Sequence, residues 1–152
     1  MKRYSTLLFL CCAVILNAQQ TLFQTKIAAN SLNSSQKISA GLSTTYNSTE
    51  YFKQNPIGLS SDLNIHLPGN RFIKADFKRK FSYSNRSESS VYSVENYPLA
   101  ELVLSQYEGI ITGMLDFGTG EKVIFHQTDA DIFAVSVVDE ASLIQKDSKD
   151  DF

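Results

Sequence analysis

The chain has 152 residues, which is the size of one domain. Its hydrophobic content of 43%, with 11% aromatic residues, is enough for a folded core and excludes a chain that is disordered throughout. The formal net charge is -2, with 14 basic and 16 acidic residues, so the chain has no basic excess of the kind that binds DNA or RNA. We therefore expect one folded domain that does not bind nucleic acid.

Residues 1–18 have the pattern of an export signal. Lys2 and Arg3 precede the apolar run Leu7–Leu16, and Asn17-Ala18 ends it with a small residue. At roughly 1.5 Å per residue this run spans about 15 Å, half of the ~30 Å apolar core of a bilayer, so we do not expect a stable membrane span. The pattern predicts cleavage after Ala18 and a secreted or periplasmic product.

Both cysteines, Cys11 and Cys12, lie inside this apolar run. Phe9 and Leu10 precede Cys11 where a lipoprotein signal would have small residues, so the soluble product is the favoured interpretation and a lipid anchor the weaker one. After cleavage the chain has no cysteine for a disulfide or a thiolate ligand. Loss of Lys2 and Arg3 leaves 12 basic against 16 acidic residues, so the expected net charge of the mature chain is -4.

Residues 19–61 form a polar leader rich in Ser, Thr, Asn and Gln. Their apolar residues follow no sustained period, so we expect mostly irregular structure. One exception is Ser48–Gln54, which we expect to form one or two helical turns, with Ser48 as the N-cap and Pro56 ending the segment.

From residue 62 the pattern changes to strict alternation. Leu63–Leu67, the turn Pro68-Gly69-Asn70 and the long segment Ile73–Tyr83 predict a β-hairpin. One side of its second arm is apolar and is expected to be buried, whereas the other carries Lys74, Asp76, Lys78 and Lys80 and is expected to face water. The residues on the apolar side are Ile73, Ala75, Phe77, Phe81 and Tyr83.

Five further segments read as strands, and Gly113 inside one of them indicates a bulge or a close approach of another chain segment. The sequence therefore predicts an all-β domain over residues 62–139: an antiparallel meander, sandwich or partly open barrel of about seven short strands, followed by a charged tail over residues 140–152. The five segments are Val91–Val94, Ala100–Tyr107, Ile110–Phe117, Lys122–Gln127 and Ile132–Val138.

No residues form a convincing catalytic, metal or cofactor constellation. His66 and His126 are the only histidines and belong to different predicted strands, so a solvated or structural role is favoured over metal binding. There is no Gly-x-Ser-x-Gly elbow and the mature chain has no thiol nucleophile. We therefore expect no catalytic, metal-binding or cofactor-binding residues and no enzyme activity.

Three weaker patterns have ordinary structural interpretations. Asp129 and Asp131 form a carboxylate pair that would suit a sugar or a calcium ion, but Asp is more common in turns between strands. Residues 118–122 resemble a phosphate loop only superficially, because they lack its spacing and lead into a strand, so they predict a hairpin. The basic run Lys74, Lys78, Arg79 and Lys80 would suit an anionic partner, but a solvated face is favoured because Asp76 interrupts it.

Four segments, Asp62–Phe72, Tyr97–Leu104, Gly109–Leu115 and Phe117–Phe125, together resemble the N-terminal propeptide of secreted reprolysin-like zinc metalloproteases, particularly bacterial ones. The resemblance covers about residues 52–139. It rests on an apolar strand that ends in a Leu-Pro-x-Gly-like turn, a long strand, and later strands joined by glycine turns.

The resemblance implies a non-catalytic domain that docks on a reprolysin-like metalloprotease domain, as a folding aid or a steric cover. The chain has no His-Glu-x-x-His motif, so we expect no protease activity. Some propeptides of this family place a cysteine on the zinc, and none remains after signal removal, so any inhibition is expected to be steric. The alternative is a standalone secreted β-sandwich that binds a glycan or a protein.

Overall fold

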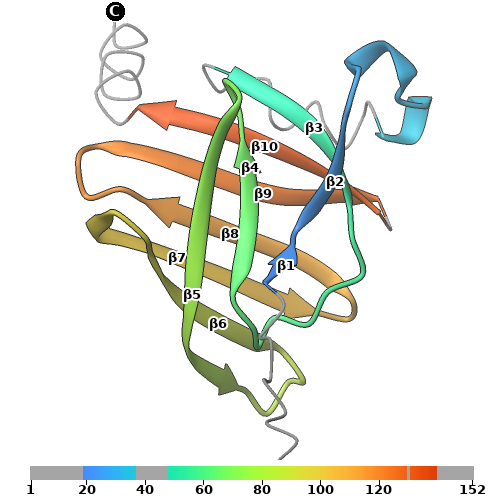
Figure 1. The fold of residues 1–152 in the computed structure, drawn as a ribbon. Helices are drawn as coiled ribbons and strands as arrows, with labels where there is room; N and C mark the ends of the chain where they lie inside the picture. Colours follow the sequence, from blue (N-terminus) through green and yellow to red (C-terminus); the bar gives the residue numbers. More distant parts are fainter. Residues whose placement is uncertain (1–18, 37–47, 130, 140–152) are drawn as a thin grey trace, which may run out of the picture.

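The computed structural model describes residues 19–36, 48–129 and 131–139, and these build one ten-stranded, mostly antiparallel sheet that curves into a nearly closed barrel (Figure 1). The predicted all-β class is confirmed. The strands are β1 (Gln20–Thr21), β2 (Phe23–Ile27), β3 (Ser48–Gln54), β4 (Leu63–Leu67), β5 (Arg71–Ser82), β6 (Glu88–Val94), β7 (Tyr97–Tyr107), β8 (Ile110–Asp116), β9 (Glu121–Asp129) and β10 (Ile132–Asp139), and a short 3-10 helix covers Ala29–Ser31.

Seven strands, β4 to β10, follow one another as an antiparallel meander, and each pairs with the next in the chain. They correspond to the seven predicted segments. The predicted hairpin over Pro68-Gly69-Asn70 is confirmed by the pairing of Leu63 with Ala75 and of Leu67 with Arg71. Figure 1 shows β4 and β5 running steeply across β8, β9 and β10, which are therefore on the opposite wall of the barrel.

The polar leader contributes the other three strands. The predicted helical turn over Ser48–Gln54 is wrong, because these residues form β3, which pairs with β10 from Ser48↔Val137 to Lys53↔Ile132. The local N-cap signal is overridden because a helix would leave the β10 edge unpaired and Phe52, which is 4% exposed, outside the core. The barrel thus includes strands from both 19–61 and 62–139, while the predictions for residues 1–18 and 140–152 lie outside the described residues.

One N-terminal segment closes the barrel by pairing with both edges of the sheet. β1 runs parallel to β4, and β2 runs antiparallel to β3. The change of partner occurs at Leu22, whose N–H donates to the carbonyl of Asn64 (2.9 Å) and whose carbonyl accepts from the N–H of Asn55 (3.0 Å). Closure in this way satisfies backbone groups that would otherwise form two open edges.

The centre of the barrel is filled by side chains. Phe23 stacks on Phe52 with ring centroids 5.0 Å apart and on Phe125 at 6.2 Å, and it meets Phe133 at 5.4 Å. Small barrels are filled in this way by their inward-facing residues, so this interior is a core. The largest fully buried side chains are Tyr92, Phe23, Phe125, Phe133, Leu22, Leu63, Ile65, Leu67, Leu102, Leu104, Leu115 and Val123.

A β-bulge in β5 reverses the side that its later residues face. Ile73 and Ala75 are buried and Phe77 packs against the core, as predicted. The register with β6 then shifts between Phe77 and Arg79, which inserts one extra residue. Because side chains alternate with period two, that residue turns Phe81 and Tyr83 outward. The predicted burial of these two is therefore wrong: they are 42% and 52% exposed.

A close approach at Gly113 and a hydrogen bond from Tyr92 determine how neighbouring parts of the barrel pack. Gly113 permits a close approach, as expected, since a Cβ at this position would lie 2.6 Å from the carbonyl oxygen of Val103. The Tyr92 hydroxyl donates to the carbonyl of Leu59 (2.8 Å) and so ties the β3–β4 connection to β6. Burial raises the pKa of Tyr92 to about 12, with the charge of Asp62 acting in the same direction and Ser90 opposing it.

Candidate functional site

The two histidines lie on different strands of the barrel. His66 is exposed on β4, with its ring against Phe72 at 5.2 Å, and half-buried His126 lies on β9 between Thr112 and Ala134 in the ladders. Within residues 19–36, 48–129 and 131–139, no three His, Cys, Asp or Glu side chains gather as a metal site would require. Metal binding therefore gains no support from the described geometry.

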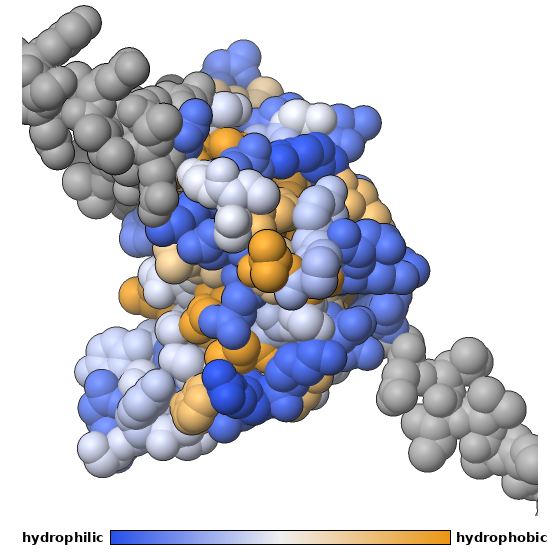
Figure 2. Space-filling model, turned by 90° about the vertical axis from the view of Figure 1, so that its left-hand side faces the viewer, coloured by the Kyte–Doolittle hydropathy of each residue, from blue (hydrophilic) through white to orange (hydrophobic). Residues whose placement is uncertain are grey.

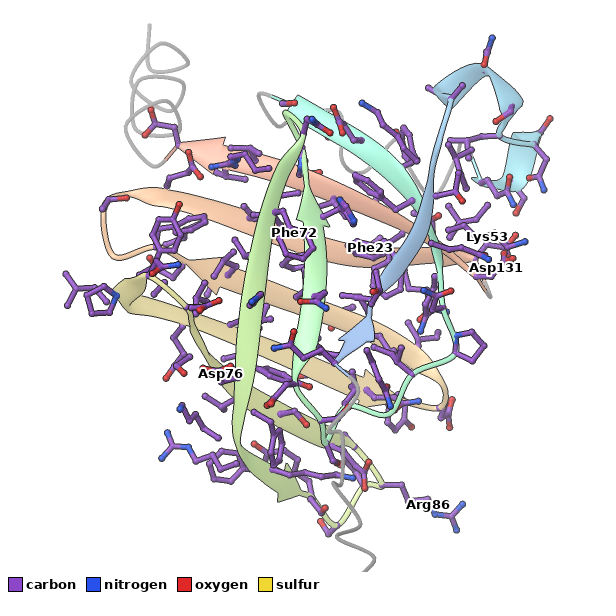
Figure 3. The ribbon with its side chains drawn as sticks, viewed as in Figure 1. Phe23, Lys53, Phe72, Asp76, Arg86 and Asp131 are labelled. Atoms are coloured by element: carbon purple, nitrogen blue, oxygen red, sulfur yellow. The ribbon has the colours of Figure 1, made fainter. Side chains whose placement is uncertain are left out.

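The acidic pair at the end of β9 is engaged in contacts within the barrel. Asp129 accepts a hydrogen bond from Gln36 Nε2 (2.8 Å), and Asp131 lies 3.5 Å from Lys53 Nζ, a pair that Figure 3 shows beside the β9–β10 turn. The two carboxylates thus bind different elements and do not converge on one ligand position. Their turn location agrees with the structural interpretation.

The glycine segment after β8 is a turn between strands. Gly118 and Gly120 adopt positive φ angles of 71° and 94°, and Gly118 N–H donates to Asp116 Oδ1 (2.8 Å). β9 follows at Glu121, so the predicted hairpin is confirmed and no helix N-terminus is available there to hold a phosphate.

The basic residues of β5 are partly neutralised by neighbours on the same face. Lys74 lies 3.5 Å from Glu95, and Lys80 lies 2.6 Å from Glu88. The Arg79 guanidinium lies over the Phe81 ring at 5.3 Å. These contacts agree with a solvated face rather than with a dense cationic patch.

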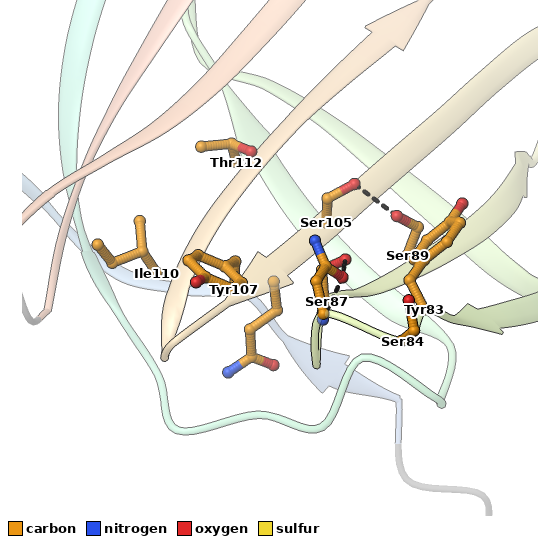
Figure 4. A pocket seen from close by; sticks show the side chains of 10 residues that line it. Tyr83, Ser84, Ser87, Ser89, Ser105, Tyr107, Ile110 and Thr112 are labelled. Carbon is orange, nitrogen blue, oxygen red and sulfur yellow. Dashed lines mark hydrogen bonds between the residues drawn. The ribbon is translucent and has the colours of Figure 1, made fainter.

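A groove of about 700 Å³ lies on the outer face of the sheet, where β5 ends and where β7 turns into β8 (Figure 4). We call it the tyrosine groove, because Tyr83 stands on one side of it in Figure 4 and Tyr107 on the other. Its volume is typical of small-molecule sites. It is lined by Tyr83, Ser84, Asn85, Ser87, Ser89, Ser105, Gln106, Tyr107, Ile110 and Thr112.

The floor of the groove is a row of short side chains that crosses three strands. Ser89 of β6 pairs with Ser105 of β7, which pairs in turn with Thr112 of β8. A hydrogen bond of 2.8 Å joins the hydroxyl groups of Ser89 and Ser105 (Figure 4). Two residues further along β7 and β8 the side chains become large, with Tyr107 opposite Ile110 on one flank and Val103 opposite Met114 on the other. The groove is therefore a direct result of side-chain size along adjacent rows.

Tight turns hold the walls of the groove. In the β5–β6 turn the Tyr83 N–H donates to the Ser87 carbonyl (2.9 Å), and the Arg86 N–H donates to the Tyr83 carbonyl (3.1 Å). In the β7–β8 turn Glu108 and Gly109 both have positive φ, as the favoured two-residue hairpin turn requires. Tyr83 directly follows β5 and Tyr107 is the last residue of β7, so each tyrosine lies next to one of these turns.

The residues that line the groove are mostly hydroxyl and amide residues, and none of them carries a carboxylate, ammonium, guanidinium or imidazole group. The charged side chains Arg86, Glu88 and Glu108 line a second hollow of about 600 Å³, which shares Ser84, Asn85, Gln106 and Tyr107 with the groove. Figure 3 shows Arg86 projecting from the tip of the β5–β6 hairpin. The charged side chains therefore lie in the adjoining hollow, outside the groove itself.

A second exposed surface lies at the end of the barrel with the β6–β7 and β8–β9 turns. Leu99 is 76% exposed and lies beside Gly118, and the Tyr97 ring packs edge-on against Phe117 at 5.1 Å. The Arg71 guanidinium lies over the same Phe117 ring, 5.7 Å from its centroid, and forms an ion pair with Glu121. We call Arg71, Tyr97 and Leu99 the turn-end surface; the Phe117 ring that Arg71 and Tyr97 contact is itself buried, at 8% exposure. Figure 2 faces this end and shows separate apolar areas among hydrophilic ones.

Neither surface could be identified from the sequence. The groove needs Ser89, Ser105 and Thr112 to be opposite one another, and only strand register decides this. The alternation of apolar and polar residues predicts that Tyr83 is buried, because nothing in that pattern indicates the bulge at Lys78. The available signal was the presence of Tyr83 and Tyr107 directly beside polar turns.

No protein-family model, curated protein or solved structure matches the chain. In the part of the chain that the structure describes, no helix has both the length and the apolar character needed to cross a membrane.

Proposed function

We propose that the chain is an exported, non-catalytic domain that acts by contact, docking on a reprolysin-like metalloprotease domain as a folding aid or a steric cover. The single observation that carries the proposal is the combination of a filled barrel with large apolar side chains left on its outside. Among the described residues the barrel interior is filled by buried side chains, so we expect a partner to bind the outer surface.

The turn-end surface supports docking on a protein. Leu99, at 76%, has the highest exposed fraction of the large apolar side chains in the described residues, and Tyr97, at 46%, is exposed in the same region of the barrel end. Aromatic residues and arginine are enriched in the centres of protein interfaces, and Arg71 belongs to the same group. The arrangement therefore suits an apolar contact with a charged rim.

The experiment is an inhibition titration with the mature chain, Gln19–Phe152, added in trans to a reprolysin-like catalytic domain. We expect slower cleavage of a peptide substrate or a higher yield of refolded protease, and no effect of thiol-modifying reagents, since the mature chain has no cysteine. Leu99→Asp should weaken the effect by placing a charge in the contact. Gln24→Asp is the matched control, because Gln24 is exposed on β2. Equal inhibition by both variants would exclude the turn-end surface, and no effect of the unsubstituted chain would exclude the function.

Export through residues 1–18 is a separate part of this proposal. Intact-mass measurement of the secreted product should place its first residue at Gln19. A lipid on Cys11 or Cys12, or a product that retains residues 1–18, would contradict a soluble exported domain.

A further inference from the structure

We infer that the tyrosine groove is a binding site for a neutral oligosaccharide. The inference goes beyond the proposed docking function, because it concerns a surface that shares no residue with the turn-end surface.

The lining of the groove determines the chemical class of the ligand. Seven of its ten residues carry a hydroxyl group, namely Tyr83, Ser84, Ser87, Ser89, Ser105, Tyr107 and Thr112, and Asn85 and Gln106 add amide groups. Hydroxyl and amide groups both donate and accept hydrogen bonds, so together they match a ligand that is itself rich in hydroxyl groups. A charged ligand would lose hydration in the groove without meeting an opposite charge.

The two tyrosines supply the apolar part of the recognition. Tyr83 is 52% exposed and Tyr107 is 49% exposed, so both rings are accessible to a ligand. A tyrosine ring offers a flat apolar body with a hydroxyl at its tip, which suits the C–H face of a sugar ring together with its hydroxyl edge. Ile110 extends the apolar wall beside Tyr107, its cross-strand partner.

The backbone around the groove disfavours a peptide as the occupant. β6, β7 and β8 each pair with a strand on both sides, so their ladders already use their backbone N–H and C=O groups. An extended peptide lying across these strands could not add to the sheet, which is the usual way such a segment gains main-chain hydrogen bonds. Recognition must come from side chains, and those present are the uncharged hydroxyl, amide and aromatic groups described above.

The dimensions fit a short oligosaccharide. The floor row crosses three strands that lie about 4.8 Å apart, which gives it a length of about 10 Å. The flanking rows are two residues away along the strands, or about 7 Å on each side. The site can therefore hold more than one sugar unit between Tyr83 and Tyr107.

The test is calorimetric titration of the mature chain with neutral hexasaccharides of glucose, mannose, xylose and N-acetylglucosamine, and with an acidic hexasaccharide of galacturonic acid. We expect saturable binding of at least one neutral hexasaccharide and weaker binding of the acidic one. Tyr83→Ala and Tyr107→Ala should each weaken binding by about three- to tenfold, the loss of one aromatic stacking contact. Tyr107→Phe should lose less, because it retains the ring.

Tyr97→Ala is the matched control, since Tyr97 is a similarly exposed tyrosine on the turn-end surface. It should leave sugar binding unchanged, and thermal unfolding of each variant shows whether the fold is retained. Absence of saturable binding, a preference for the acidic hexasaccharide, or equal binding after both groove substitutions would overturn the inference. Loss of protease inhibition by Tyr107→Ala, without sugar binding by the unsubstituted chain, would assign the groove to a protein partner instead. If the chain binds a neutral hexasaccharide but does not inhibit the protease, the proposed docking function is contradicted and the sugar-binding inference is not.

Discussion

The N–H group of Leu22 donates to the carbonyl oxygen of Asn64 at 2.9 Å, and through this contact the start of the described chain joins the strand that begins the meander. On its other side the same residue accepts from Asn55, at the opposite edge of the sheet. Closure of the barrel therefore rests on a segment of only eight residues, Gln20–Ile27, and on the side chains that it places inside.

Phe23 is the main inward anchor of this segment, so Phe23→Ala should lower the free energy of unfolding by about 3–5 kcal/mol. It would remove the ring that packs on Phe52, Phe125 and Phe133. Urea denaturation measures the change. The neighbouring exposed residue provides the control, since Gln24→Ala should alter stability by no more than about 0.5 kcal/mol. Similar small losses for both variants would show that the segment does not close the barrel in solution.

The bulge in β5 predicts opposite outcomes for two phenylalanines four residues apart. Phe77 packs edge-on against Tyr92 at 5.8 Å, so Phe77→Asp should cost several kcal/mol, on the order of 3, through lost apolar burial and an unpaired charge. Phe81 is 42% exposed, and Phe81→Asp should cost less than about 1 kcal/mol. Chemical denaturation of both variants is the measurement. A large cost at Phe81 would mean that the alternation continues without a bulge.

Gly113 of β8 leaves no room for a side chain against β7, so Gly113→Ala should destabilise the fold by about 1–3 kcal/mol. The added Cβ would lie 2.6 Å from the Val103 carbonyl oxygen, and the backbone there cannot move without breaking the ladder. Gly58→Ala is a suitable comparison, because nothing lies within 4 Å of its Cβ position. A shift of the thermal midpoint that is no larger for Gly113→Ala than for Gly58→Ala would contradict the close approach.

Tyr92 should make stability depend on pH in the alkaline range. Its pKa is raised from 10.0 to about 12, so the folded protein keeps this proton more tightly than the unfolded chain does. The stabilisation that results from this difference in pKa is complete below pH 10 and is lost as the pH rises towards 12. At roughly 1.4 kcal/mol per pKa unit, it contributes about 2–3 kcal/mol to the free energy of unfolding. Urea unfolding at pH 9 and pH 11 should show a smaller decline for Tyr92→Phe than for the unsubstituted chain. Identical declines would show that Tyr92 is not buried as a neutral phenol.

The sequence by itself determined the class of the fold and the strands after residue 62. In β4 and the first half of β5, alternation of buried and exposed side chains is a local property, because a strand with one wet face repeats every two residues. The turns at Pro68-Gly69-Asn70 and Gly118-Thr119-Gly120 are equally local, since their backbone angles depend on the residues that form them.

Only the tertiary structure decided how the leader folds, which way the side chains at the end of β5 face and where the tyrosine groove lies. Leu22 and Phe23 are adjacent and both buried, a pattern that breaks alternation because the chain changes partner between them. The side that Phe81 faces depends on one extra residue in a pairing with β6. The groove floor joins Ser89, Ser105 and Thr112, which are up to 23 positions apart (112 − 89 = 23), through register. Register and closure are free-energy minima of the whole sheet, so no window of the sequence specifies them.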